Sequence, residues 1–231
     1  MIINPDINIE RDCIKNLFLG LKSYSNIAAI GANLINKDGS YQKGFTARKF
    51  PTLLSTCFEI IGLAKIFPKN HITNNYLLTD NDILKNYFSN SFTSGPKQNS
   101  PIIVDQPAGA CLMIRKEAFN QISGFEEDYY PAWFEDVDFC KRLNKAGWVC
   151  AVEAKAKAIH EGGYSLSTMS RPEFFSIWYK NLIKYWKTHG SSLDRLIIRI
   201  FIKLGLSIRA LLSLRKEKKD AKEYFKLLSR L

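Results

Sequence analysis

The spacing of apolar side chains changes along the start of the chain and predicts a different element for each spacing. MII, residues 1–3, has the character of the end of a buried strand, and Asn4-Pro5-Asp6 stops it. Residues 9–24 place apolar side chains three and four positions apart, which predicts an amphipathic helix. IAAIGANLI, residues 27–35, is a continuous apolar run bounded by a turn signal, and we expect a buried strand there.

The middle of the chain is less regular. Residues 50–68 lie between two prolines and predict a helix. Residues 69–101 are polar and rich in Asn and Ser, so we expect a mobile loop that takes part in acceptor choice. The pattern of residues 102–122 predicts strand, turn, strand and a short helix.

An acidic helix and a second strand region follow. The helix begins near Glu135 and is closed by Gly147, with basic residues in its last turns. Residues 148–160 are predicted as short strands that end at His160, before the flexible sequence EGGYS. The alternation of strands and helices indicates an α/β fold over residues 1–170.

The chain from Arg171 is helical by period, and we treat residues 171–231 as a separate tail. Residues 193–214 follow a sequence typical of a capping box and form an amphipathic pattern at 100° per residue. Its basic positions gather in about a third of the helical wheel: Arg195, Arg199, Lys203 and Arg209. Apolar positions cover the opposite side: Leu196, Ile200, Phe201, Leu204, Ile208 and Leu211.

Charge separates the same two regions. Residues 1–170 carry 18 Lys/Arg against 17 Asp/Glu, whereas residues 171–231 carry 15 against 5. The basic tail is either a helix packed on the domain with a solvated charged face, or an interfacial helix on an anionic membrane surface. Nucleic-acid binding is not expected, because the tail lacks interleaved stacking aromatics and any known binding module.

The five cysteines are odd in number, and none forms a C-x-x-C pair. Since each has apolar neighbours, we expect buried, reduced thiols rather than a disulfide frame. The sequence MIINPDINIERD has no basic region followed by a long apolar run, so no signal peptide is expected. A membrane-spanning helix is not expected either, because no apolar run is long enough.

Three polar features carry the candidate chemistry: the turn Asn4-Pro5-Asp6, the acidic cluster Glu135-Asp136-Val137-Asp138, and His160 before a Gly-Gly pair. Strand ends and helix starts are where α/β folds place binding groups. Each feature also has a plain structural interpretation. Asn-Pro-Asp is a common turn, acids favour the positive end of a helix dipole, and a lone histidine is usually a surface or core residue.

Taken together, the motifs resemble a known enzyme family. GACLMIRKEAF, GFEEDYYPAWFEDVDFCKRLNKAGW and AIHEGGYS, within residues 101–163, resemble the C-terminal half of family 2 glycosyltransferases. Rhamnosyltransferase-like members with a GT-A nucleotide-sugar fold are the most similar. NPDINIERD and IGANLINKDGSYQKG are similar to the middle of that family, so the resemblance covers roughly residues 1–190. The implied fold is a partial GT-A domain.

The resemblance implies roles for single residues on the metal side. Asp6 matches the last acid of the Asp-x-Asp-like motif that holds a Mg²⁺ or Mn²⁺ ion on the donor diphosphate. Asn4 stands where many members have the first Asp, and His160 matches the histidine that completes the metal site in several members.

It implies further roles on the acceptor side. Asp136 matches the catalytic base, with Glu135 beside it towards the acceptor. The small residues Gly109 and Ala110 match a stretch where backbone approaches the sugar. Trp133 offers a flat face for a sugar ring or for core packing, two interpretations that remain open. Asp138 is also expected to bind the substrate.

The activity that the resemblance implies is inverting, metal-dependent transfer of a sugar, with rhamnose as a candidate, from a nucleotide-diphosphate donor such as dTDP-rhamnose. The acceptor would be a saccharide or a lipid-linked saccharide in cell-surface polysaccharide synthesis, O-antigen included. The implied location is cytoplasmic and peripheral, on the inner face of a bacterial cell membrane. The alternative is a non-catalytic remnant of a transferase that associates with a membrane or a partner.

The family has further strands and helices before the Asn-Pro-Asp motif, about 80–100 residues from domain-size priors. We therefore expect the chain to be a fragment of a longer enzyme. A separate chain that supplies this nucleotide-binding part, or a relative that has lost donor binding, are the other two interpretations.

Overall fold

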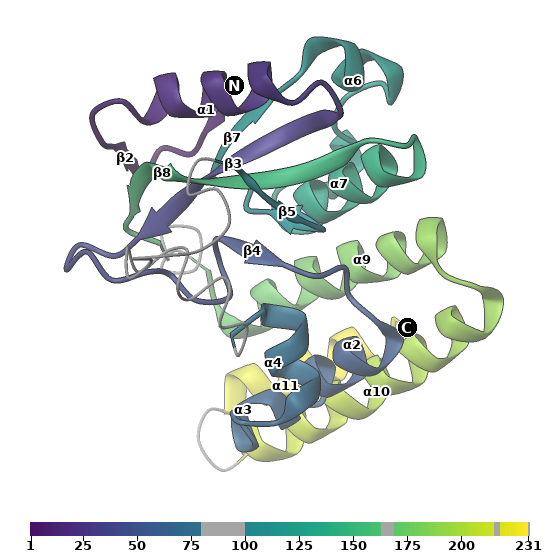
Figure 1. Cartoon of the computed structure of the whole chain (residues 1–231). Helices are drawn as coiled ribbons and strands as arrows, with labels where there is room; N and C mark the ends of the chain where they lie inside the picture. The colour runs from purple at the N-terminus through teal and green to yellow at the C-terminus, as the bar shows by residue number, and fades with distance from the viewer. Residues whose placement is uncertain (80–99, 163–168, 215–217, 231) are drawn as a thin grey trace. The chain divides into compact units, whose positions relative to one another are not determined.

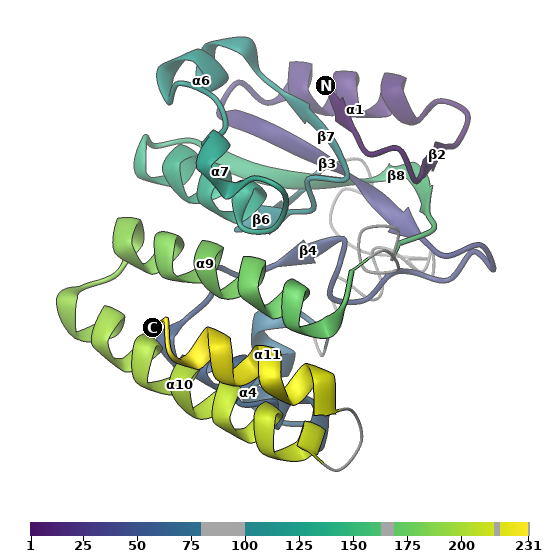
Figure 2. The ribbon, with the colours of Figure 1, turned by 180° about the vertical axis from the view of Figure 1, so that it is seen from behind.

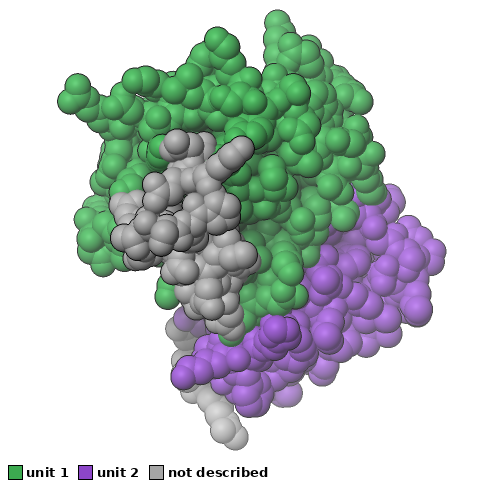
Figure 3. Space-filling model, in the orientation of Figure 1, with its two compact units in different colours: residues 1–50, 74–126, 135–164 green, residues 51–73, 127–134, 165–231 purple. Residues whose placement is uncertain are grey.

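The computed structural model describes residues 1–79, 100–162, 169–214 and 218–230 (Figure 1). The chain divides into two compact units, each assembled from separated segments (Figure 3). Unit 1 comprises residues 1–50, 74–126 and 135–164, and unit 2 comprises residues 51–73, 127–134 and 165–231.

Unit 1 contains a mixed sheet in the order β1-β7-β3-β8-β2, with β5 also paired to β8. Its strands are β1 (Ile2–Ile3), β2 (Ile7–Ile9), β3 (Ile27–Ile35), β5 (Ile102–Val104), β7 (Cys111–Ile114) and β8 (Val149–His160). β3 and β8 run parallel, and the other pairings are antiparallel. A second, two-stranded sheet pairs β4 (Ala47–Arg48) with β6 (Gln106–Pro107). The expected α/β class is confirmed.

β3 and β8 form the centre of the sheet. All nine residues of β3 are buried, as expected for a continuous apolar run covered on both faces. The prediction of several short strands over residues 148–160 is wrong, because β8 is one strand with two irregularities in its pairing to β3. Between Ala32 and Asn33 on β3, the partner on β8 moves from Glu153 to Lys157. This bulge lets a strand with charged residues remain paired along the whole of β3.

Helices cover both faces of this sheet (Figure 2). α1 (Cys13–Ser23) packs on one face, where its buried residues Cys13, Leu17 and Leu21 join the β3 core. α6 (Lys116–Gln121) and α7 (Glu135–Lys145) belong to a second cluster that includes Phe139 and Leu143. The expected helices at these positions are confirmed, and the sheet is therefore the middle of three layers.

Residues 50–101 differ from their predictions. Residues 50–68 form two helices, α2 (Leu53–Ile60) and α3 (Leu63–Ile66), because Gly62 adopts the left-handed conformation with φ 80°. The predicted loop over residues 69–101 contains α4 (His71–Leu77) in its first part. Residues 80–99, where the remainder of that loop prediction falls, lie outside the described residues.

The helices of unit 2 are α9 (Arg171–His189), α10 (Ser192–Leu214) and α11 (Lys218–Leu228), together with α2, α3 and the short 3-10 helix η1 (Glu127–Tyr129). α10 packs against α2, α9 and α11. The predicted capping box is confirmed, since Ser191 and Asp194 exchange hydrogen bonds at the start of α10. The described residues of the tail are largely helical, in α9, α10 and α11, so its predicted helical character is confirmed.

The five cysteines are buried and free, as expected. Over the residues that the structure describes, no helix is both long and apolar enough to cross a bilayer.

Candidate functional site

Strand pairing in unit 1 brings Asp6 and His160 together. β2 begins directly after Asp6, β8 ends at His160, and Ile7 is the partner of His160 in the antiparallel register. The backbone N–H of Glu161 donates to the Asp6 carbonyl at 3.1 Å. The side chains follow the backbone, and His160 Nε2 lies 3.4 Å from Asp6 Oδ2. Two residues that are far apart in the sequence thus face each other.

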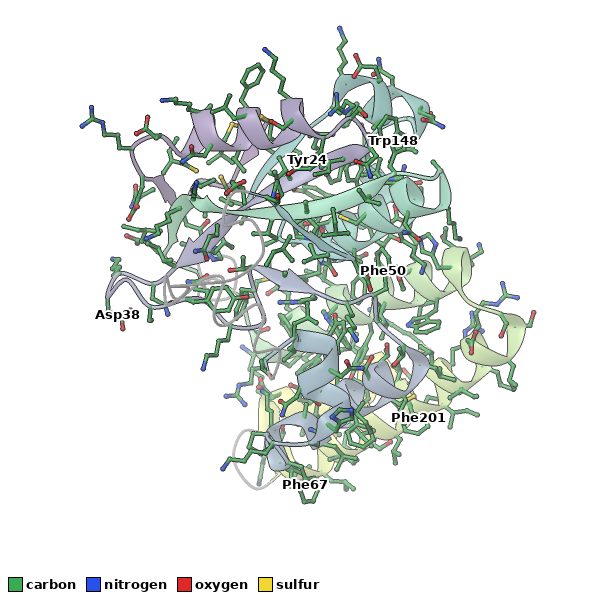
Figure 4. The ribbon with its side chains drawn as sticks, viewed as in Figure 1. Tyr24, Asp38, Phe50, Phe67, Trp148 and Phe201 are labelled. Carbon is green, nitrogen blue, oxygen red and sulfur yellow. The ribbon has the colours of Figure 1, made fainter. Side chains whose placement is uncertain are left out.

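Gln42 fixes the orientation of the His160 ring. Its Oε1 lies 2.9 Å from His160 Nδ1, and its Nε2 donates to the His160 carbonyl at 2.7 Å. The same Nε2 donates to Asn36 Oδ1 at 2.9 Å, and Asn36 in turn donates to Ser40 Oγ. The network ends at Asp38, which accepts from the Ser40 hydroxyl and lies at the tip of the loop after β3 (Figure 4).

This network decides which ring nitrogen of His160 carries the hydrogen. Because Gln42 Nε2 meets two carbonyl oxygens, Gln42 Oε1 must face the ring, and Nδ1 donates the hydrogen bond. The lone pair of Nε2 then points to the carboxylate of Asp6, and two acceptors at this distance repel each other. A cation shared by the two side chains would remove this repulsion.

The residues fit a divalent cation as a partial ligand set. A carboxylate oxygen of Asp6 and a neutral nitrogen of His160 lie close enough to bind one ion, and the second ring nitrogen is already held by a neighbour. Among the described residues, no group of three or more His, Cys, Asp and Glu side chains is arranged to hold a metal. Mg²⁺ commonly takes one or two protein ligands and completes its shell with phosphate oxygens and water.

The carboxylate of Asp136 is held by backbone amides at the start of α7. The N–H of Val137 donates to Oδ1 at 2.7 Å, and the N–H of Gly109 donates to Oδ2 at 3.3 Å. A Cβ at Gly109 would lie 3.1 Å from the Cβ of Asp136, so the small residue allows this close contact. The sequence assigned Gly109 to the acceptor, and the structure places it against the candidate base.

A backbone contact joins the two parts of the site. The N–H of Asn4 donates to the Ala110 carbonyl at 2.8 Å, where β1 ends beside β7. Ala110 follows Gly109, which holds Asp136, and Asn4 stands two residues before Asp6. This hydrogen bond places the segment that carries Asp6 beside the segment whose Gly109 contacts Asp136.

Glu135 differs from its neighbour. Burial, followed by the adjacent charge of Asp136, raises the pKa of Glu135 to about 7. Its Oε2 is buried and makes no hydrogen bond with the described residues. Burial is thus the larger cause of the raised pKa of Glu135, and the neighbouring carboxylate is the smaller one.

Asp138 has a structural place. Its side chain is only 2% exposed, and Arg142 Nε donates to its Oδ2 at 2.8 Å, one helical turn along α7. A carboxylate that is buried and paired in this way is not placed to contact a substrate. The interpretation of Asp138 as a substrate-binding residue therefore finds no support in the structure.

The residues before α7 have an unusual backbone. Trp133 and Phe134 both have positive φ angles, 70° and 74°, which large side chains rarely adopt. Within unit 2, the buried Asn181 of α9 holds this segment by donating to the carbonyls of Tyr129, Ala132 and Trp133. The ring of Trp133 is half-buried and packs edge-on against Phe174, with ring centroids 4.6 Å apart.

The sequence analysis missed two positioning residues, Gln42 and Asn181. Gln42 follows a turn and lies 118 positions from His160, so no spacing rule connects the two. The side chain of Asn181 in α9 has no exposed surface. The helical pattern of the sequence does not reveal that a single Asn is buried. Both act through contacts between distant segments.

Known proteins were compared with the chain. No protein-family model matches it. Over 165 residues the chain is 27% identical to N-acetylglucosaminyl-diphospho-decaprenol L-rhamnosyltransferase of Mycobacterium tuberculosis, in strains CDC 1551 / Oshkosh and ATCC 25618 / H37Rv alike. The match covers 71% of this chain and 47% of each relative, so the chain spans about half the length of the curated relatives it matches. This similarity to rhamnosyltransferases supports a glycosyltransferase role.

Proposed function

We propose that this chain carries the metal side and the base side of an inverting glycosyltransferase with a GT-A fold. The donor is a nucleotide-diphosphate sugar, with rhamnose as the sugar that the named relatives transfer. The acceptor is a saccharide or a lipid-linked saccharide. One observation carries the proposal: the Asp6–His160 pair and the carboxylate of Asp136 are connected within unit 1 through the contact of Asn4 with Ala110.

The candidate base suits proton transfer from an acceptor hydroxyl. As the hydroxyl oxygen attacks the anomeric carbon, its proton passes to the carboxylate of Asp136, which two backbone N–H groups hold in a fixed orientation. The bond from the anomeric carbon to the diphosphate oxygen breaks, and its electron pair leaves with the nucleoside diphosphate. Attack from the face opposite the leaving group inverts the anomeric configuration.

Asp6 and His160 suit the leaving-group side of the same reaction. They would hold Mg²⁺ or Mn²⁺, which neutralises the charge that develops on the diphosphate. Gln42 keeps the imidazole turned so that Nε2 faces Asp6, and in this way it prepares the two ligands before the donor binds. Glu135 lies beside Asp136, and its partial protonation near neutral pH reduces the repulsion between the two carboxylates.

The test is sugar transfer by the protein as its gene encodes it, with Asp136→Asn as the variant. We expect transfer from a nucleotide-diphosphate rhamnose to a lipid-diphosphate N-acetylglucosamine to fall about 100-fold or more, because the amide cannot accept the proton. Asp12→Asn is the matched control. Asp12 is an exposed acid of unit 1 in a left-handed conformation that Asn also adopts readily.

Transfer by the parent and the control, together with its loss in Asp136→Asn, supports the enzyme. Full activity of Asp136→Asn rejects Asp136 as the base. Absence of transfer by the parent with every nucleotide sugar favours the alternative, a non-catalytic remnant that binds a membrane or a partner.

A further inference from the structure

A row of large apolar side chains on α10 faces solvent. At 100° per residue these positions fall within a sector of about 80° of the helical wheel. We call them the α10 stripe: Leu193, Leu196, Ile200, Leu204 and Leu211. Leu196, Ile200 and Leu204 are exposed to 57%, 54% and 47%, which is unusual for three successive turns of one helix.

The core of unit 2 already uses the other face of this helix. Ile198, Ile202 and Leu206 are almost completely buried, and Gly205 lies against the carbonyl of Ile60 in α2. α10 is therefore anchored by its opposite side, and the α10 stripe is additional apolar surface that folding of unit 2 leaves uncovered. Figure 2 shows α10 beside α11, with which it packs.

Basic side chains lie along one edge of the α10 stripe. Arg199 and Lys203 are exposed and follow the stripe along adjacent wheel positions. Arg209, which the sequence grouped with them, is turned inward instead. Its Nη1 donates to the Ile60 carbonyl at 2.7 Å, and its guanidinium lies 4.0 Å from the centre of the Phe175 ring. The exposed basic edge is thus narrower than the helical wheel suggested.

The charge of the tail favours an anionic surface over a second copy of the chain. Residues 171–231 carry 15 basic against 5 acidic residues, and α11 adds exposed lysines next to α10. Two copies joined along the α10 stripe would bring like charges together, which costs free energy. A bilayer that contains acidic lipids instead offers phosphates to the basic residues and an acyl boundary to the leucines.

We propose that the α10 stripe is the surface by which this chain lies on an anionic lipid bilayer. The stripe enters the boundary between headgroups and acyl chains, and the side chains of Arg199 and Lys203 extend to the headgroup phosphates. This inference goes beyond the transferase proposal and does not depend on it.

The experiment is co-sedimentation of the full chain with vesicles of phosphatidylcholine and phosphatidylglycerol in comparable amounts, and with phosphatidylcholine alone. We expect binding to the mixed vesicles that weakens as salt is added. The triple variant Leu196→Gln, Ile200→Gln and Leu204→Gln should bind at least about tenfold more weakly than the parent, because it removes apolar side chains from the interface. These positions are exposed, so the exchange leaves the core of unit 2 intact.

The matched control replaces three exposed apolar residues of α1, with Ile14→Gln, Phe18→Gln and Leu19→Gln. It should bind the mixed vesicles like the parent. Equal binding by the parent and the α10 variant overturns the proposal, as does loss of binding in the α1 control alone.

Light scattering tests the other possible occupant of the α10 stripe, a second copy of the chain, because it measures whether the parent is a dimer. If the parent is a dimer that the α10 variant dissociates without any change in vesicle binding, the stripe is a dimer interface and the proposal is wrong. A second variant, Arg199→Glu with Lys203→Glu, should lose the preference for phosphatidylglycerol. A retained preference also contradicts the proposal.

Discussion

The three carboxylates at the start of α7 meet three different environments, although they occupy four consecutive positions. Asp138 is buried in an ion pair with Arg142, and Asp136 accepts hydrogen bonds from two backbone amides. Glu135 is half-buried, its Oε2 makes no hydrogen bond with the described residues, and its pKa rises to about 7. The repulsion within the cluster is thus reduced by pairing, by amide dipoles and by protonation, one residue at a time.

Glu135→Gln tests this difference through the pH dependence of stability. Since burial raises the pKa of Glu135 from 4.5 to about 7, the unfolded chain ionises first, and the folded state loses stability as pH rises through this range. The variant removes that loss. We expect it to be more stable than the parent by about 3 kcal/mol at pH 8 and nearly equal to it at about pH 4.5.

Urea unfolding at the two pH values measures this stability difference. Glu117→Gln, an exposed acid in the first turn of α6, is the matched control and should show no such pH dependence. A difference between Glu135→Gln and the parent that is the same at both pH values contradicts the assigned pKa.

At the scale of elements, the sequence predicted those parts of the fold whose side chains follow a period. The mostly apolar run of β3 and the helical spacing of apolar residues in α1 and α7 appear in the structure where the pattern places them. The positions at which these elements are interrupted were harder to predict from the sequence. Gly62 ends α2 because it adopts a positive φ, whereas an isolated glycine in a helical pattern is usually tolerated. The bulge in β8 depends on its partner strand, which no local pattern records.

The candidate site shows the same limit. Asp6, Asp136 and His160 were assigned roles because their motifs resemble those of a known family, and these roles stay predictions. Gln42, which orients the imidazole, was not found, because its role exists only after β2 and β8 have paired and the loop after β3 has folded back.

Gly205→Ala tests the packing of α10 on α2. In an open helix this exchange stabilises by about 1 kcal/mol, since glycine has the lower helix propensity. Here the new Cβ would lie 2.7 Å from the Ile60 carbonyl oxygen, so we expect a loss of about 1–3 kcal/mol instead. Thermal unfolding gives the sign.

Ser207→Ala on the same helix is the control, because it also introduces the better helix former without a backbone clash. Only a small change is expected for it. An increase in stability for Gly205→Ala would show that α10 does not approach α2 as closely as the structure places it.

At the scale of the whole molecule, charge and chemistry are separated along the sequence. Residues 1–170 are nearly neutral and hold the proposed catalytic residues, whereas residues 171–231 carry the excess of basic residues and the α10 stripe. The two proposals follow this division, since the proposed catalytic residues lie in the first part and the proposed membrane-binding surface in the second. The two proposals can nevertheless fail independently, because they rest on different residues and different measurements.

The central claim is that Asp6 and His160 bind one cation beside the candidate base Asp136. Paramagnetic broadening by Mn²⁺ tests it directly, because the amide signals nearest the bound ion broaden first in NMR spectra. We expect the amides of Ile7, His160 and Glu161 to broaden at the lowest Mn²⁺ concentrations, because they adjoin the two ligands, followed by Val137. Asp6→Asn should shift this broadening to higher concentrations. Broadening that begins elsewhere, or that Asp6→Asn leaves unchanged, would contradict the claim.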